Sequence, residues 1–84
     1  MNIKNIRYFI NINLSLGYYF KEDIEQSYKF LENIDLSEKS VLDENSKLSI
    51  NIRKVALLNK IGKKEEARKL YEEVVENGNK LHVV

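Results

Sequence analysis

The chain has 84 residues, of which 43% are hydrophobic and 32% charged, a balance that predicts one small globular domain and not a disordered chain. Its formal net charge of +1 offers no electrostatic basis for holding nucleic acid or an anionic membrane. The absence of cysteine and the presence of a single histidine, His82, exclude disulfide frameworks, thiolate metal sites and multi-histidine chemistry.

The first predicted helix runs from about Ile3 to Phe20 and is apolar on two sides. At 100° per residue, its apolar residues fall on two arcs. One arc contains Ile3, Ile6, Ile10, Leu14 and Tyr18, and the other contains Phe9, Ile12, Leu16, Tyr19 and Phe20. Because a helix that is apolar on two sides must be covered on two sides, we expect something to pack on each arc.

The second predicted helix starts near Asp23 and ends near Ile34. Asp23 and Gln26 have the spacing of a capping box, in which the carboxylate accepts a free backbone N–H at the helix start. The chain has no proline and only three glycines, which favours long helices, and no segment has a sustained strand pattern.

The third predicted helix ends at Ile61, because Gly62 suits the left-handed residue that follows a helix end. Its start lies near Asp43 or as early as Ser37, since no residue between them forbids a helix. The apolar residues Leu48, Ile52, Val55 and Ala56 have helical spacing and not strand spacing.

The fourth predicted helix runs from about Lys64 to Asn77. Gly78 is expected to stop it, which leaves residues 78–84 as an apolar tail. All four predicted elements are therefore helices.

The chain contains an internal repeat with an offset of 40 residues. Residues 14–34 align with residues 54–74, and both segments predict a helix, a tight polar turn and a second helix. Repeats of 20–50 residues are typical of stacked supersecondary units. The aligned pairs in the second helices are Ser27 with Ala67, Leu31 with Tyr71, and Ile34 with Val74.

The repeated segments resemble the tetratricopeptide (TPR) family. Gly62, Ala67 and Tyr71 match that family's turn glycine, small residue and aromatic in the second unit. In the first unit the matching residues are Asn13, Leu14, Ser15 and Tyr18 for helix A, and Ser27 and Leu31 for helix B. The resemblance implies an all-α fold of two TPR-like antiparallel helical hairpins, either an α-solenoid fragment or a small bundle. It implies one domain over 1–84, with repeat 1 at about 3–34 and repeat 2 at about 43–77.

Small residues have a physical role in this interpretation. Ser15 with Ser27, and Val55 with Ala67, would let the paired helices approach closely. The sequence also departs from the family, because Glu22 replaces the turn glycine of the first unit and the spacing is 40 residues in place of 34. A weaker resemblance links the chain to the peptide-sensing domains of bacterial quorum-type regulators.

The TPR resemblance implies that helix A of each unit lines a concave groove for a protein or peptide partner. From the residues alone, three interpretations of the aromatic arc stay open: a core face covered by the other hairpin, a homodimer interface, or a ligand groove. The partner-binding candidates are Phe9, Ile12, Asn13, Leu16, Tyr19, Phe20, Arg53, Asn59 and Lys60.

We expect a non-catalytic, cytoplasmic protein that forms a homodimer or else is part of a longer repeat array, because two repeat units leave apolar surface at both ends. The first residues lack the continuous apolar core of a signal peptide, and no apolar run is long enough for a membrane span. No acid, base, nucleophile or metal set converges, so no cofactor, metal, membrane or nucleic-acid partner is expected. The alternative functions are a structural assembly module and a fragment of a peptide-responsive transcriptional regulator.

Overall fold

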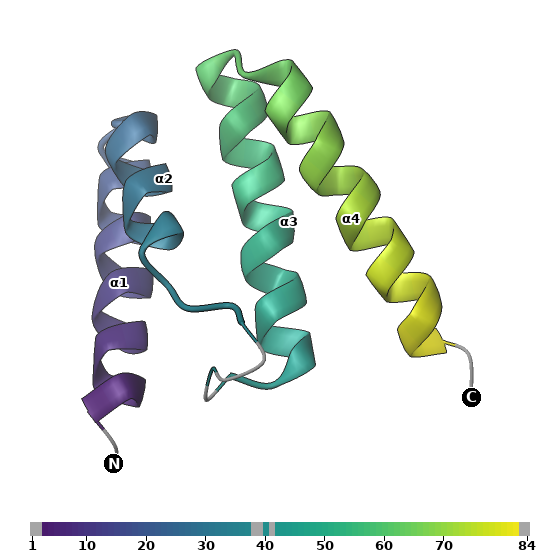
Figure 1. Ribbon diagram of the computed structural model, residues 1–84. Coiled ribbons are helices and arrows are strands. Elements are labelled where there is room, and N and C mark those ends of the chain that lie inside the picture. Colours follow the sequence, from purple (N-terminus) through teal and green to yellow (C-terminus); the bar gives the residue numbers. More distant parts are fainter. Residues whose placement is uncertain (1–2, 38–39, 41, 83–84) are drawn as a thin grey trace. The chain divides into compact units, whose positions relative to one another are not determined.

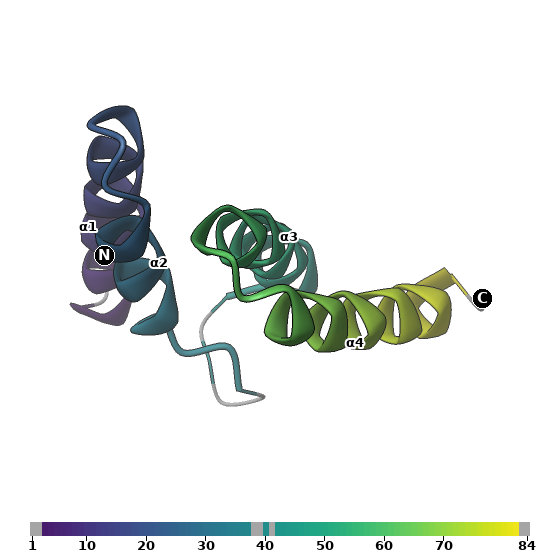
Figure 2. The ribbon, with the colours of Figure 1, turned by 90° about the horizontal axis from the view of Figure 1, so that it is seen from above.

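The computed structural model describes the backbone of residues 3–37, 40 and 42–82, and the side chains of residues 6–37, 40 and 42–76. This part of the chain contains no strand and four helices, α1 (Ile3–Phe20), α2 (Ile24–Glu32), α3 (Glu44–Ile61) and α4 (Lys64–His82). The all-α prediction is confirmed. The chain divides into two compact units, Met1–Asp43 and Glu44–Val84. In each unit two antiparallel helices pack together, α1 with α2 and α3 with α4 (Figures 1 and 2).

The turn between α1 and α2 closes with the two hydrogen bonds of a Schellman motif. The Glu22 N–H donates to the carbonyl of Tyr19 at 3.0 Å, and the Asp23 N–H donates to the carbonyl of Tyr18 at 2.9 Å. Glu22 has a φ of 65°, in the left-handed region that costs energy for any residue with a side chain. A glutamate therefore occupies a position that normally favours glycine.

The turn between α3 and α4 repeats this pattern 40 residues later. The Gly62 N–H donates to the carbonyl of Asn59 at 3.1 Å, and the Lys63 N–H donates to the carbonyl of Leu58 at 2.9 Å. Gly62 has a φ of 95°, as the sequence predicts for the residue after this helix. The 40-residue offset of the sequence repeat is thus also present in the backbone hydrogen bonds of the two turns.

The start of α2 is capped as predicted. A carboxylate oxygen of Asp23 accepts the Gln26 N–H at 3.3 Å, which satisfies one of the free donors of the first turn. The N–H of Asp23 itself already donates to Tyr18. The two motifs together therefore leave a connection of only three residues between α1 and α2.

A pair of buried serines forms the contact between α1 and α2. The Ser15 hydroxyl donates to the carbonyl of Ser27 at 2.8 Å, and the Ser27 hydroxyl donates to the carbonyl of Ser15 at 2.8 Å. The two hydroxyl oxygens lie 3.0 Å apart. Both residues are almost completely buried, so the predicted close approach at these small side chains is confirmed. Among the described side chains of the same unit, the buried apolar residues are Leu31 and Ile34.

The second unit places an alanine where the first has a serine. Ala67, the counterpart of Ser27, is buried, and Val55, the counterpart of Ser15, is half-buried. The other buried apolar residues described in this unit are Ile50, Leu57, Leu58 and Val74. The same position of the repeat is therefore filled by hydrogen-bonded hydroxyls in one hairpin and by apolar side chains in the other.

The predicted end of the fourth helix is wrong. Helix α4 continues through Gly78 to His82, so the predicted tail from residue 78 is largely helical. A single glycine inside a helix costs only about 1 kcal/mol relative to alanine and does not by itself end the helix. The last two residues lie outside the described part of the chain.

The early start considered for the third helix is also wrong, because α3 begins at Glu44. Local turns occupy the preceding segment. The Ser37 N–H donates to a carboxylate oxygen of Asp35 at 2.9 Å, and the Leu42 N–H donates to the hydroxyl of Ser40 at 3.1 Å. Short polar side chains that bond nearby backbone groups compete with helix formation in this way.

Candidate interaction surface

Helix α1 exposes an unusual amount of apolar surface. Among the described side chains, six of the nine exposed large apolar residues belong to this helix: Ile6, Phe9, Ile10, Leu14, Tyr19 and Phe20. Its 18 residues include only two with charged side chains, whereas nine of the 19 residues in α4 are charged. Apolar surface that is concentrated on one helix and not diluted by charges makes this helix the candidate interaction surface.

Helix α2 covers neither of the two predicted arcs completely. It packs on the side of α1 marked by Ser15, which lies between the arcs. Ile6 and Ile10 of one arc stay exposed, and so do Phe9 and Phe20 of the other, with Phe20 79% exposed. The expectation that both arcs are covered is therefore not met by α2, the helix that packs against α1 in the first unit.

Four of the six exposed large apolar residues lie on one face of the helix, together with two exposed small or polar residues and one half-buried leucine, and we call this face the α1 stripe. At 100° per residue its members lie within about 60° of Asn13 on either side, while Ser15 lies about 160° away. Several members are seven residues apart, the spacing of a helix seam that contacts another helix. The α1 stripe consists of Ile6, Phe9, Ile10, Asn13, Leu16, Gly17 and Phe20.

Four of the predicted partner-binding residues belong to the α1 stripe: Phe9, Asn13, Leu16 and Phe20. Two others on the same helix do not. Ile12 is half-buried on the flank of the contact with α2. The Tyr19 ring meets the Phe20 ring edge to face, with centroids 6.0 Å apart, and the residue remains 39% exposed.

The other three candidates, Arg53, Asn59 and Lys60, belong to α3 in the second unit. Asn59 and Lys60 are exposed near the end of this helix, and Arg53 is half-buried. Their grouping with the α1 residues into one groove stays a prediction.

The sequence interpretation missed three members of the α1 stripe. The periodicity places Ile6 and Ile10 on the opposite arc and predicts no role in binding for Gly17. The signal that could have identified them is the seven-residue spacing of a helix seam. Ile10 precedes Gly17 by seven residues, and Ile6 precedes Asn13 by seven and Phe20 by fourteen.

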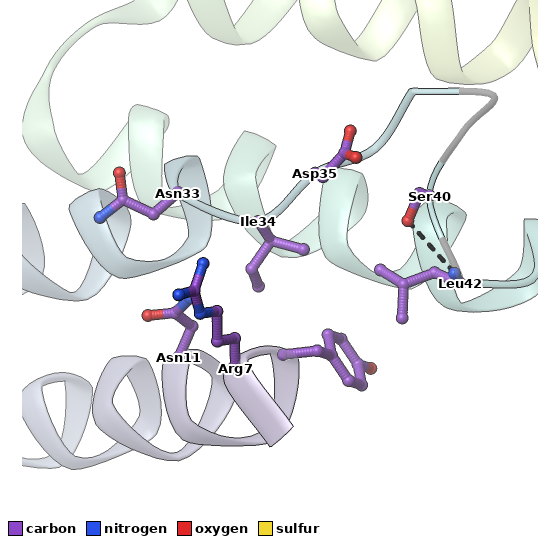
Figure 3. A pocket seen from close by; sticks show the side chains of 8 residues that line it. Arg7, Asn11, Asn33, Ile34, Asp35, Ser40 and Leu42 are labelled. Carbon is purple, nitrogen blue, oxygen red and sulfur yellow. Dashed lines mark hydrogen bonds between the residues drawn. The ribbon is translucent and has the colours of Figure 1, made fainter. Parts of the chain in front are cut away.

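A small hollow lies in the first unit beside α1 (Figure 3). Its volume is about 230 Å³, below the roughly 300 Å³ at which small-molecule sites begin. Arg7 and Asn11 extend from α1 towards Ile34 (Figure 3). The full lining is Arg7, Tyr8, Asn11, Asn33, Ile34, Asp35, Ser40 and Leu42. The hollow is therefore smaller than a usual small-molecule site.

Within the described residues, no group of three or more histidine, cysteine, aspartate or glutamate side chains is placed to hold a metal ion. None of the helices in that part combines the length and the apolarity that a bilayer crossing requires. The charged side chains of α4 pair with one another: Arg68 lies 2.9 Å from Glu65 and 3.0 Å from Glu72. All three are well exposed, so these pairs form a solvated face and not a site.

Comparison with known proteins finds no similarity for this chain. No protein-family model matches it. Searches of the curated proteins and of the solved structures give no significant match. The function proposed below therefore depends on the geometry of α1 and on the sequence pattern.

Proposed function

We propose that this protein is a non-catalytic interaction module that binds another polypeptide through the α1 stripe. One observation supports the proposal most strongly: the stripe exposes four large apolar side chains, Ile6, Phe9, Ile10 and Phe20, on a helix with almost no charge. Leaving such surface in water is unfavourable by roughly 25 cal/mol for each Å². Its removal from water by a partner provides a driving force for association.

The shape of the α1 stripe favours a helical partner. From Ile6 to Phe20 it spans 14 helical steps, or roughly 21 Å. It is straight and narrow, with anchors three, four and seven residues apart, which is the pattern by which one helix packs along another. The TPR resemblance agrees with this assignment, because helical hairpins of that family present a helix face to peptides.

The test uses synthetic amphipathic helical peptides with apolar residues at positions i, i+3, i+4 and i+7, labelled with a fluorophore. Binding to the full chain is measured by fluorescence anisotropy. We expect Phe9→Asp to weaken binding at least about tenfold, because the charge must be desolvated in the contact. Tyr71→Asp is the matched control, since Tyr71 on α4 is 57% exposed and Phe9 is 51% exposed.

Circular dichroism of both variants shows whether the helices are kept. The proposal is rejected if the chain binds none of the peptides and also stays monomeric at high concentration. It is also rejected if the two substitutions weaken binding equally, because the contact would then not depend on α1.

A further inference from the structure

We propose that the polypeptide that covers the α1 stripe is a second copy of this chain, in an antiparallel pair of α1 helices with a two-fold axis at Asn13. This inference rests on the proposed function and specifies its partner. The first argument is position, because Asn13 lies at the centre of the stripe in both directions. It is seven residues from Ile6 and seven from Phe20, and the other members flank it on both sides around the helix.

Gly17 supplies the second argument. Glycine in the interior of a helix is unfavourable, so its presence there calls for a reason. Its backbone needs no positive φ, and a Cβ added at this position would meet nothing within 4 Å. The described part of the chain therefore gives no reason for glycine at this exposed position. A gap within an apolar stripe is explained by a large side chain of another molecule that fills it.

The third argument is that the stripe is complementary to itself. An antiparallel two-fold axis at Asn13 pairs each residue with the one equally far on the other side. It places Phe9 of one copy opposite Gly17 of the other, so the large ring meets the gap. It also pairs Ile6 with Phe20. An unrelated partner would not require large and small residues to be symmetrically placed about Asn13.

Asn13 itself fits the axis. A side-chain amide both donates and accepts hydrogen bonds, so two copies of the same amide can bond to each other across a two-fold axis. A single asparagine within an apolar helix seam fixes register and the number of helices in coiled coils. The polar residue at the middle of the stripe would therefore specify one alignment out of several.

Charge favours the antiparallel orientation. Arg7 is near the start of α1, while the turn just after its end contains Lys21, Glu22 and Asp23, so that its net charge is negative. A parallel pair would bring the two arginines together and the two acidic turns together. An antiparallel pair brings each arginine towards the acidic turn of the other copy and also opposes the helix dipoles favourably.

The size of the surface predicts a weak dimer. Together, the large exposed apolar side chains of the stripe present roughly 400–500 Å² of solvent-accessible surface per copy. A pair would bury roughly 800–1,000 Å², below the roughly 1,200–2,000 Å² of stable specific interfaces and within the size of weak, transient ones. The expected dissociation constant is on the order of micromolar to tens of micromolar.

The first test is sedimentation equilibrium of the full chain from about 1 to 500 µM, a range that brackets this affinity. Gly17→Phe should weaken the dimer at least about tenfold, because two rings then compete for one space. Phe9→Ala should also weaken it. The double variant with both changes should recover much of the affinity. In a two-fold pair, the ring introduced at position 17 of one copy faces the space opened at position 9 of the other.

A chain that stays monomeric up to about 500 µM contradicts the inference. So does a dimer that Gly17→Phe leaves unchanged, or a double variant no better than Gly17→Phe alone. A monomer that still binds the amphipathic peptides rejects the self-pairing while the proposed function stands. Helix content is checked for each variant by circular dichroism, so loss of folding is recognised directly.

The second test fixes the orientation by disulfide formation, which the absence of cysteine makes simple. Only a residue near a two-fold axis lies close enough to its own copy to form a disulfide. Asn13→Cys should therefore cross-link the dimer under mild oxidation, and Ile6→Cys should not. Efficient cross-linking through Ile6→Cys would indicate a parallel pair and contradict the antiparallel arrangement.

Discussion

The two hairpins of this chain have the same backbone turns but are built from different side chains. Glu22 and Gly62 hold the same place in the turns, 40 residues apart, and both have positive φ. Ser27 and Ala67 hold the same place in the second helices, and both are buried. The backbone geometry is thus kept where the side-chain chemistry is not. This indicates that turn position and side-chain size, more than polarity, determine the hairpin.

The helix faces differ more than the turns. Helix α1 exposes the apolar α1 stripe, whereas α4 exposes a face on which Arg68 pairs with two glutamates. Exposed positions are free of the packing constraints that fix the buried ones, so they can differ between repeats. This difference supports the proposal that the first unit carries the binding surface.

The largest effect is expected at the pair Leu31 and Tyr71, which occupy the same position of the repeat. Leu31 is 0% exposed and Tyr71 is 57% exposed. Leu31→Ala should reduce the free energy of unfolding by about 2–5 kcal/mol, because it leaves a cavity. Tyr71→Ala should change it by less than about 0.5 kcal/mol. Urea unfolding followed by circular dichroism measures both, and equal losses would contradict the different burial.

A smaller effect is expected from exchanging the turn residues. Gly62→Glu should reduce the unfolding free energy by about 1–2 kcal/mol, because it forces a side chain into the left-handed region. Glu22→Gly should increase it by about 0.5–1 kcal/mol, since it relieves the same strain in the first unit. Thermal unfolding of the two variants gives the signs. A Glu22→Gly variant less stable than the parent chain would show that Glu22 is not strained.

The serine pair should give an effect of about 1 kcal/mol. Ser27→Ala removes the hydroxyl that donates to Ser15, and should lower the unfolding free energy by about 1 kcal/mol. Ala67→Ser makes the reverse change and should also destabilise by about 1 kcal/mol, because it buries a hydroxyl opposite Val55. Chemical unfolding compares the two. Stabilisation by Ser27→Ala would mean that the hydrogen bonds contribute nothing.

The smallest effect is expected at the helix starts. Asp23 caps α2, whereas Lys63, its counterpart, has a side chain that cannot accept a hydrogen bond. Asp23→Ala should therefore destabilise by about 0.5–1 kcal/mol, and Lys63→Asp should stabilise α4 by about 0.5 kcal/mol. The shift in melting temperature of each variant relative to the parent chain measures these two changes in stability. A stabilising Asp23→Ala would exclude the capping role.

Much of this fold could be predicted from the sequence, because local signals specify its helix ends. The range from Ile3 to Phe20 and the end at Ile61 agree with the structure, and both are followed by a recognisable turn. The errors occur where local signals are ambiguous. Gly78 was interpreted as a stop, although glycine only weakens a helix. Ser37 was allowed as a helix start, although its own turn competes.

The candidate site could be predicted only in part. Periodicity identified the apolar arcs of the first helix, and Phe9, Asn13, Leu16 and Phe20 lie in the α1 stripe. Periodicity does not tell which side of a helix its neighbour covers. That side is marked by Ser15, which the TPR resemblance predicts as a close contact and no hydrophobicity pattern marks. The α1 stripe combines residues of both predicted arcs, so the arcs alone do not define it.

The most direct test of the central claim compares two isoleucines of nearly equal exposure. Ile10 in the α1 stripe is 51% exposed, and Ile52 on α3 is 55% exposed. Association of the full chain and of each aspartate variant is measured by sedimentation equilibrium. Ile10→Asp should abolish association, and Ile52→Asp should leave it within about twofold of the parent chain. Equal loss in both variants, or association that survives Ile10→Asp, would contradict the assignment of the binding surface to α1.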